Sequence, residues 1–417
     1  MAGPICSTSG SRAPAWLRTR PGIHNIQSRR RESGRSEMLL APHRVLDLTG
    51  PLGYVCGKVL ADLGADVVKI EPPGGDARDL YWVASNAGKR SVVIDLDSEE
   101  GRATLRRLIA KADFLIESYK PGTLDHQNLH KLNPRLIMVS ITPFGQTGPY
   151  ANYQASDLEI MALSGAMSLA GEEDGEPMRV SAPQAAWWVG VEAAMGALTA
   201  LEWRANSGKG QHVDVSAQAA VLSAIAHAPA FWDVNRINPL RAGIYVTGRS
   251  VTGAKMTALW PCRDGWINFI IYGGTAGRHT NQQLVAWMDE KGFALDSLKA
   301  IDWSTFTVTS LTQQDVDRLE KPIGAFLATL TKQEFLEAAL QREMLGYPVS
   351  TVADIFKDRQ LAARAFWSEV LDATTGSTIK APGGFAIVNG SRIPAGPRAP
   401  RAGEHNDEIL MAKEGSV

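Results

Sequence analysis

The chain of 417 residues contains only three cysteines, Cys6, Cys56 and Cys262, spaced too far apart for a metal-binding pattern or a disulfide framework. A reducing cytoplasm therefore fits best as its compartment, and we expect no metal site. No run of 18 uninterrupted apolar residues occurs, so no membrane span is expected. The 43 basic and 44 acidic side chains leave a net charge of -1. The clustered basic excess of a nucleic-acid-binding surface is therefore missing.

The glycine pattern of a dinucleotide site is also missing. After the first apolar run the glycines stand at Gly50, Gly53 and Gly57. This is not the G-x-G-x-x-G spacing that lets a backbone approach a pyrophosphate, and no Walker lysine pattern occurs. Both observations argue against a nicotinamide dehydrogenase or a P-loop enzyme.

Apolar runs alternate with helical spacing over the first half of the chain. A strand at Arg44–Leu48, a helix at Tyr54–Leu63 and a strand at Ala65–Ile70 form one βαβ unit. Ser98 is expected to cap the next helix, and Asp157 the helix that runs through Ser164. Further strands are predicted at Ser91–Leu96, Phe114–Ile116, Leu136–Ile141 and Gln211–Val215, and a helix at Ala217–His227. The alternation indicates a doubly wound α/β fold.

Composition divides the chain into five stretches. Residues 1–37 hold seven arginines, no lysine and no apolar period. This composition indicates a disordered extension, and an organellar transit peptide is the alternative. Residues 38–230 form the large α/β domain, 231–250 a linker and 251–347 a smaller α+β domain. From residue 348 to 417 the chain is expected to return to the large domain.

A series of segments, in order, resembles the family III CoA-transferases, the carnitine dehydratase and bile-acid-inducible F (CaiB/BaiF) group. Together they cover nearly all of residues 44–410. The resemblance implies a Rossmann-like large domain built from both chain ends, a small central domain and two interlocked subunits. The segments include GADVVKIEPPGGDARD, NAGKRSVVIDL, ADFLIESYKPGTL, SGKGQHVDVS and RAPRAGEHNDEIL.

The resemblance also implies where coenzyme A binds, as a substrate and with no tightly held cofactor. Phosphates require cationic or backbone donors, and an aromatic ring can stack on adenine. Alternatively, Lys89 is a solvated strand edge, and His126 a neutral surface histidine at a position where an arginine often meets phosphate. The implied contact positions are Pro51, Leu52, Pro72, Ser85, Asn86, Lys89, Ser118, Tyr119 and His126.

At the position of the family's nucleophilic aspartate this chain has Ala186. In the usual mechanism that aspartate attacks the acyl-CoA carbonyl and forms a mixed anhydride, which a methyl group cannot do. Glu192 is six residues further on, about 240° around a helix, and is a poor replacement. Trp187 and Trp188 either pack as ordinary helix residues or narrow an acyl pocket. Related racemases need a histidine where Ser156 stands.

Three hypotheses follow. The first is a CoA-transferase chain acting on an acyl-CoA and a carboxylic acid, as a homodimer or as the aspartate-lacking partner of a paralogue. The second is a non-catalytic acyl-CoA-binding or scaffold protein. The third is an acyl-CoA isomerase or racemase-like enzyme. We expect Glu404 and His405 to attach the C-terminal segment to the large domain rather than to act as an acid/base pair.

Overall fold

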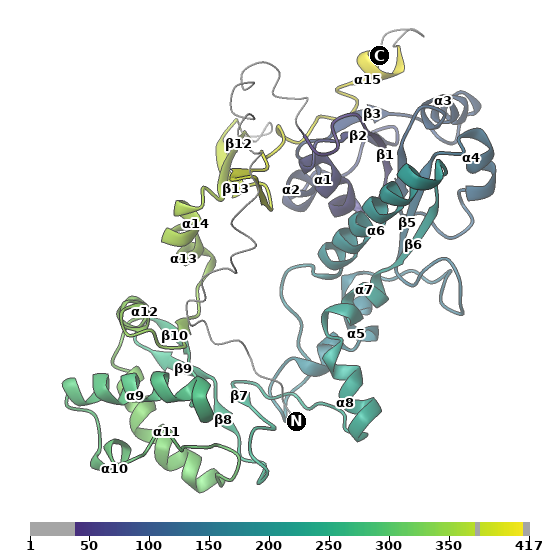
Figure 1. Cartoon of the computed structure of the whole chain (residues 1–417). Coiled ribbons are helices and arrows are strands. Elements are labelled where there is room, and N and C mark those ends of the chain that lie inside the picture. The colour runs from purple at the N-terminus through teal and green to yellow at the C-terminus, as the bar shows by residue number, and fades with distance from the viewer. Residues whose placement is uncertain (1–37, 372–375, 412–417) are drawn as a thin grey trace, which may run out of the picture.

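The computed structural model describes residues 38–371 and 376–411, and Figure 1 shows them as a larger and a smaller lobe. The larger lobe contains the purple to teal part of the chain, and the smaller lobe contains the green part. The predicted extension at 1–37 lies outside the described residues.

A parallel sheet of six strands, in the order β3-β2-β1-β4-β5-β6, forms the centre of the large lobe. This order is that of the doubly wound dinucleotide-binding fold. The predicted α/β fold class is therefore confirmed. Each strand expected in this sheet is present, with ends that differ from the prediction by at most three residues. The strands are β1 Arg44–Leu48, β2 Asp66–Glu71, β3 Arg90–Val93, β4 Phe114–Glu117, β5 Ile137–Thr142 and β6 His212–Ser216.

Helices cover both faces of this sheet because alternate strand residues point to opposite sides. Val45 packs in the core beneath α1 and α6, whereas its neighbour Leu46 packs in the core beneath α3 and α4. Each such buried aliphatic side chain stabilises the fold by about 1.5–3 kcal/mol. The helices of this lobe are α1 Tyr54–Asp62, α2 Leu80–Asn86, α3 Glu99–Ile109, α4 His126–Leu132, α5 Asp157–Leu163, η2 Ala166–Leu169, α6 Ala185–Ser207, α7 Ala217–Ala224 and α8 His227–Asn235.

Of the two N-cap residues predicted from the sequence, one is confirmed and the other is wrong. Ser98 caps α3 as expected, accepting a hydrogen bond from the amide of Gly101 at 2.9 Å. The cap predicted at Asp157 is wrong, because Ser156 is the N-cap of α5. There the Glu159 carboxylate accepts from the Ser156 amide at 2.7 Å, which completes a capping box.

The small lobe has its own core around the antiparallel sheet β11-β10-β9. The helix predicted at Ala217–His227 is divided into α7 and α8, and α8 extends into the stretch 231–250. The boundaries predicted for the linker and the small domain stay predictions. The elements are β7 Tyr245–Val246, β8 Met256–Thr257, β9 Leu259–Cys262, β10 Gly265–Asn268, α9 Gly274–Glu290, α10 Asp296–Lys299, α11 Gln313–Leu327, α12 Lys332–Gln341 and β11 Tyr347–Pro348.

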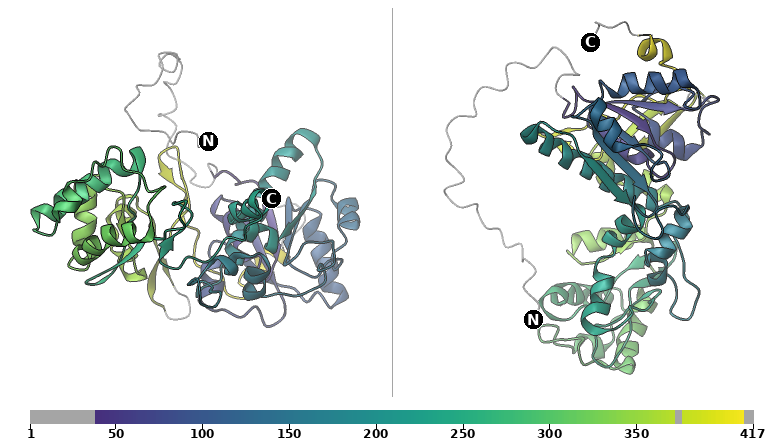
Figure 2. Two further views of the ribbon diagram at one scale, coloured as in Figure 1. Left: turned by 90° about the horizontal axis from the view of Figure 1, so that it is seen from below. Right: turned by 90° about the vertical axis from the view of Figure 1, so that its right-hand side faces the viewer.

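The chain then returns to the large lobe, where Figure 2 shows α15 in yellow beside the blue segments. Ile409 joins the core on the α3 face, and the His405 amide donates to the Ser91 carbonyl at 2.9 Å. The large domain is thus built from both ends of the chain, as predicted. The returning elements are α13 Val352–Phe356, α14 Arg359–Ala363, β12 Trp367–Leu371, β13 Thr378–Pro382, β14 Ile387–Val388, β15 Ser391–Arg392 and α15 Asn406–Leu410.

Candidate functional site

The topology locates the candidate site before any side chain is considered. β1 and β4 are neighbours at the point where the strand order reverses, and ligands of such sheets bind in the crevice beyond the carboxyl ends of these strands. A cavity of about 270 Å³ lies there. Its lining includes Pro51 and Leu52 from the loop after β1, Ser118 and Tyr119 from the loop after β4, and Tyr153. Four of the nine predicted contact residues therefore meet at one cavity.

The loop after β1 is held in one shape by hydrogen bonds to its backbone. The Gly50 amide donates to Ser118 Oγ at 2.6 Å, and the Tyr81 hydroxyl donates to the Pro51 carbonyl at 2.9 Å. Asp47 Oδ1 accepts from the Thr49 amide at 2.9 Å. The loop is thus ordered by neighbouring elements, and an ordered loop loses little conformational entropy when a ligand binds.

The other predicted contact residues lie away from this cavity. Pro72 is exposed in the turn after β2, where its carbonyl accepts from the Gly75 amide. Ser85 and Asn86 are fully buried in α2, and the Asn86 side-chain amide donates to the Trp82 carbonyl at 2.9 Å. Their position under the surface favours a supporting role over direct ligand contact.

Lys89 is buried as well, and its ammonium group has three acceptors. Its Nζ donates to Asp47 Oδ2 at 2.7 Å and to the Tyr54 carbonyl and Asn86 Oδ1 at 2.8 Å each. Burial lowers the pKa of Lys89, and the Asp47 carboxylate opposes this effect. Burial alone would raise the pKa of Asp47, but the ammonium groups of Lys89 and Lys69 hold it below its usual value. With its protons engaged, Lys89 has none to offer a phosphate.

His126 belongs to a cluster of three imidazoles outside the cavity lining. Its ring stacks on His212 with centroids 4.8 Å apart, and His130 lies 5.7 Å from it. Ser140 Oγ lies 2.9 Å from His212 Nε2. Partial burial, followed by repulsion from His212 and His130, lowers the pKa of His126. A neutral imidazole is a weak partner for a phosphate at pH 7.

Ala186 lies in the first turn of α6 and is buried, while Trp187 and Trp188 next to it are 45% and 47% exposed. Gly190, one turn later, allows α6 to pack closely on α1, since a Cβ there would lie 2.6 Å from Val55 Cβ. This contact joins α6 to α1, and α1 begins where the loop after β1 ends.

One carboxylate lies at the start of α6, and it comes from α5. Asp157 Oδ1 accepts hydrogen bonds from the amides of Gln184 and Ala185, both at 2.7 Å. These amides belong to the helix N-terminus, which has no other internal partner for them. Asp157 therefore serves as the cap that α6 lacks in its own sequence.

Three residues that shape the site were not singled out from the sequence: Asp47, Lys69 and Tyr81. Asp47 and Lys69 stand inside strands, each between two apolar neighbours, and both are buried. A charged residue inside a buried strand is rare unless it is paired, so this pattern was the available signal. Nothing in the local sequence points to Tyr81.

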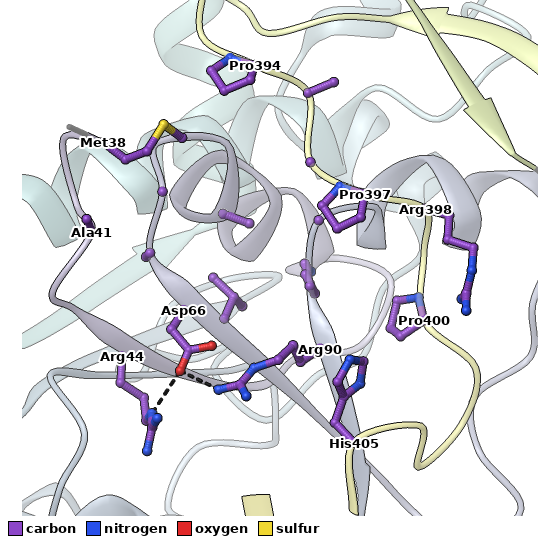
Figure 3. A pocket seen from close by; sticks show the side chains of 18 of the residues that line it. Met38, Ala41, Arg44, Asp66, Arg90, Pro394, Pro397, Arg398, Pro400 and His405 are labelled. Atoms are coloured by element: carbon purple, nitrogen blue, oxygen red, sulfur yellow. Dashed lines mark hydrogen bonds and ion pairs between the residues drawn. The ribbon is translucent and has the colours of Figure 1, made fainter. Parts of the chain in front are cut away.

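A second cavity, of about 770 Å³, lies at the opposite edge of the sheet, where β1, β2 and β3 begin (Figure 3). Asp66 pairs there with both Arg44 and Arg90. Arg398 pairs with Glu404 at 2.6 Å. Glu408 also pairs with Arg90 at 2.7 Å. Three carboxylates thus balance the three guanidinium groups, and the cavity offers little to an anionic ligand. The His405 contact with Ser91 attaches the C-terminal segment to the sheet, as predicted for His405. Glu404 instead pairs with Arg398 inside the same segment, so the attachment predicted for Glu404 is not seen in the part of the chain that the structure describes.

Over residues 38–371 and 376–411, the structure contains no helix with the length and apolar character needed to cross a bilayer. The same residues bring together no group of three histidine, cysteine, aspartate or glutamate side chains suited to a metal ion.

The structure is that of a doubly wound α/β protein with a cavity at its topological switch point. The profile of CoA-transferase family III matches residues 40–406, and the chain belongs to this family. It is 34% identical to the succinyl-CoA:(R)-benzylsuccinate CoA-transferase subunit BbsE of Thauera aromatica, over 88% of this chain and 92% of the relative. The succinyl-CoA–L-malate CoA-transferase beta subunit of Chloroflexus aurantiacus is 29% identical, over 89% and 93%.

Among solved structures, a CaiB/BaiF family protein from Brucella suis superimposes with a TM-score of 0.73. It is 28% identical, and the match covers 88% of this chain and 97% of that one. The resemblance described from the sequence motifs is confirmed.

Proposed function

We propose that this chain is the aspartate-lacking subunit of an acyl-CoA:carboxylate CoA-transferase and works with a paralogue that carries the aspartate. The observation on which this proposal rests is Ala186, which lies buried in the first turn of α6, the helix that packs on α1. Its methyl group cannot attack a thioester. The nearby Asp157 carboxylate is used to cap α6.

The two subunits together would transfer CoA in four steps. The partner's carboxylate attacks the acyl-CoA carbonyl and expels the CoA thiolate, which leaves a mixed anhydride. The thiolate attacks the aspartyl carbonyl of the anhydride, forms an aspartyl-CoA thioester and releases the donor acid. The acceptor carboxylate then attacks this thioester and expels the thiolate again, and the thiolate finally attacks the new acyl group, which frees the aspartate. Coenzyme A is thus a substrate that enters and leaves.

Two features support a second subunit. The two relatives described above are named as a subunit and a beta subunit. In addition, the face of α6 turned away from the sheet is apolar and exposed. Its exposed apolar residues are Trp187, Trp188, Val191, Met195 and Trp203. Monomeric proteins rarely leave such a contiguous apolar surface exposed to water. We propose that an interlocked partner covers this face, and we place the pair in the cytoplasm because the cysteines are dispersed.

Co-expression with an aspartate-bearing paralogue tests the proposal. The purified pair should transfer CoA from succinyl-CoA to an acceptor acid, and the pair whose partner has the aspartate changed to asparagine should not. The chain purified alone should be inactive. Full activity of the chain alone would contradict the proposal.

The rival hypothesis of a non-catalytic acyl-CoA-binding protein rests on the same Ala186. Calorimetry separates the two, because that hypothesis requires CoA binding with no turnover in any pairing. An isomerase or racemase is less favoured, since Ser156 and Ala186 replace both of the groups that would move the proton.

A further inference from the structure

Two buried lysines bind the two ends of the loop that carries Pro51 and Leu52. At the start of the loop, Lys69 Nζ donates to the Thr49 carbonyl at 2.7 Å. At its end, Lys89 Nζ donates to the Tyr54 carbonyl at 2.8 Å. Both lysines are only 2% exposed. Neither is therefore a surface charge that reaches the loop by chance.

Asp47 connects these contacts. Its Oδ2 pairs with Lys89 Nζ at 2.7 Å, while its Oδ1 accepts from the Thr49 amide at 2.9 Å and from the Thr49 hydroxyl at 2.6 Å. One buried carboxylate thus joins the first residue of the loop to the lysine that holds its last residue. On the other side, Lys69 Nζ lies 3.5 Å from Asp76 Oδ2.

We propose that Lys69 and Lys89 are positioning residues that hold the loop Thr49–Tyr54 in the shape that receives coenzyme A, without touching the ligand. This inference rests on the proposed CoA site. It replaces the direct contact predicted for Lys89 from the family resemblance. Below, the set Asp47, Lys69 and Lys89 is called the loop clamp.

The chain shows an independent sign of the clamp at Gly57 on α1. A Cβ at this position would overlap Asp47 Oδ2 and lie 2.9 Å from Lys89 Nζ. Gly57 is helical, where alanine would ordinarily be preferred to glycine. The ion pair therefore occupies the space in which a side chain of α1 would lie. Gly57→Ala should displace the pair while every charge remains.

Four variants of the full chain test the proposal: Lys69→Met, Lys89→Met, Gly57→Ala and the double variant Asp47→Asn/Lys89→Met. The double variant removes both buried charges together, which is tolerated far better than leaving one carboxylate unpaired. The amide introduced by Asp47→Asn keeps a carbonyl oxygen for Thr49, but the Tyr54 carbonyl still lacks its donor. Lys58→Met is the matched control, since Lys58 neighbours Gly57 on α1 and pairs with Asp62 outside the clamp.

Two measurements are made on each variant. Amide hydrogen exchange, read on a peptide that covers residues 49–54, measures how well the loop is ordered. Calorimetry measures the affinity of the chain for coenzyme A. We expect faster exchange in this peptide and at least ~10-fold weaker CoA binding in the clamp variants. A loop that is disordered before binding loses conformational entropy when CoA binds, and this loss lowers the affinity. The double variant should regain thermal stability without regaining affinity. Lys58→Met should match wild type in both measurements.

Wild-type affinity and wild-type exchange in the double variant and in Gly57→Ala would overturn the proposal. So would rapid exchange of the loop amides in the wild-type protein. If the wild-type chain binds no CoA alone or with its partner, the proposed function fails. The exchange data then decide on the clamp by themselves, where a selective loss of protection at 49–54 supports it and unchanged protection overturns it.

Discussion

Asp157 Oδ1 accepts a hydrogen bond from the backbone amide of Ala185 at 2.7 Å, directly before the position that lacks the family's aspartate. The helix that would carry the nucleophile is thus still anchored, although the nucleophile is absent. The chain keeps the architecture of the site and has lost one functional group from it.

Removing this anchor should destabilise the protein. Asp157→Ala leaves the amides of Gln184 and Ala185 without their acceptor and should lower the free energy of unfolding by about 1 kcal/mol. Asp157→Asn retains an acceptor oxygen, so its free energy of unfolding should fall by clearly less than that of Asp157→Ala. Denaturant unfolding of both variants measures the difference, and an alanine variant as stable as wild type would show that the cap is dispensable.

Restoring the carboxylate should restore the covalent chemistry. Ala186→Asp places an acid in the first turn of α6, where the helix dipole favours negative charge. With an acyl-CoA and hydroxylamine, we expect hydroxamate at least ~10-fold above the Ala186→Asn control, which has the same size and no nucleophile. The wild-type chain should give no more hydroxamate than the Ala186→Asn control. Trapping on Asp157 in the wild-type chain would contradict our assignment of that residue.

The histidine cluster should make stability depend on pH. The pKa values of His126 and His212 lie below 6.5 in the folded protein, chiefly because of burial. Below pH 6.5 the unfolded chain then binds more protons than the folded one. The stabilising contribution is complete above pH 6.5 and is lost as the pH falls below it.

We therefore expect a lower free energy of unfolding at about pH 5.5 than at about pH 7.5, with a smaller difference in His126→Asn. The facing groups that influence His126 are His130, His212 and Asp125. The Asp214 carboxylate raises the pKa of His212 and so opposes part of the effect of burial. His227→Asn is the control, because His227 is exposed at the start of α8. An equal pH dependence in all three proteins would exclude the cluster as its source.

The C-terminal segment should contribute to the core of the large domain. Ile409 is 9% exposed and packs in the core on the α3 face. Ile409→Ala should lower the free energy of unfolding by about 2 kcal/mol, at the low end for such truncations. Met411→Ala, at a side chain that is 73% exposed, should change it little. Equal stabilities of the two variants would mean that the segment is only loosely attached.

The strands were predictable because parallel strands buried on both faces consist mostly of apolar residues, as in Phe114–Ile116 of β4 and Ile137–Val139 of β5. The error at Asp157 has a local and a distant cause. Ser156 and Glu159 show the S-x-x-E signature of a capping box, which marked the true cap. The actual partners of Asp157 lie 27 and 28 residues away, and no local pattern reports them.

The site was predictable only in part, for a similar reason. Pro51, Leu52, Ser118 and Tyr119 follow strand ends, and the topology of the sheet brings such positions together. Lys89 looks like a surface cation in the sequence, but its acceptor Asp47 is 42 residues away. His126 is separated by a still longer stretch from His212, on which it stacks. Tertiary contacts of this range decide whether a charge faces a ligand or the interior.

The attachment of the C-terminal segment also bears on biosynthesis. The outer edge of β3 is occupied by the segment around His405, since the His405 amide donates to the Ser91 carbonyl and the Val93 amide donates to Asn406 Oδ1 at 2.9 Å. An uncovered strand edge is a template for aggregation. During translation this edge stays uncovered until more than 300 further residues have been made. A nascent chain therefore needs another protein to cover the edge of β3, whereas in the finished protein the C-terminal segment covers it.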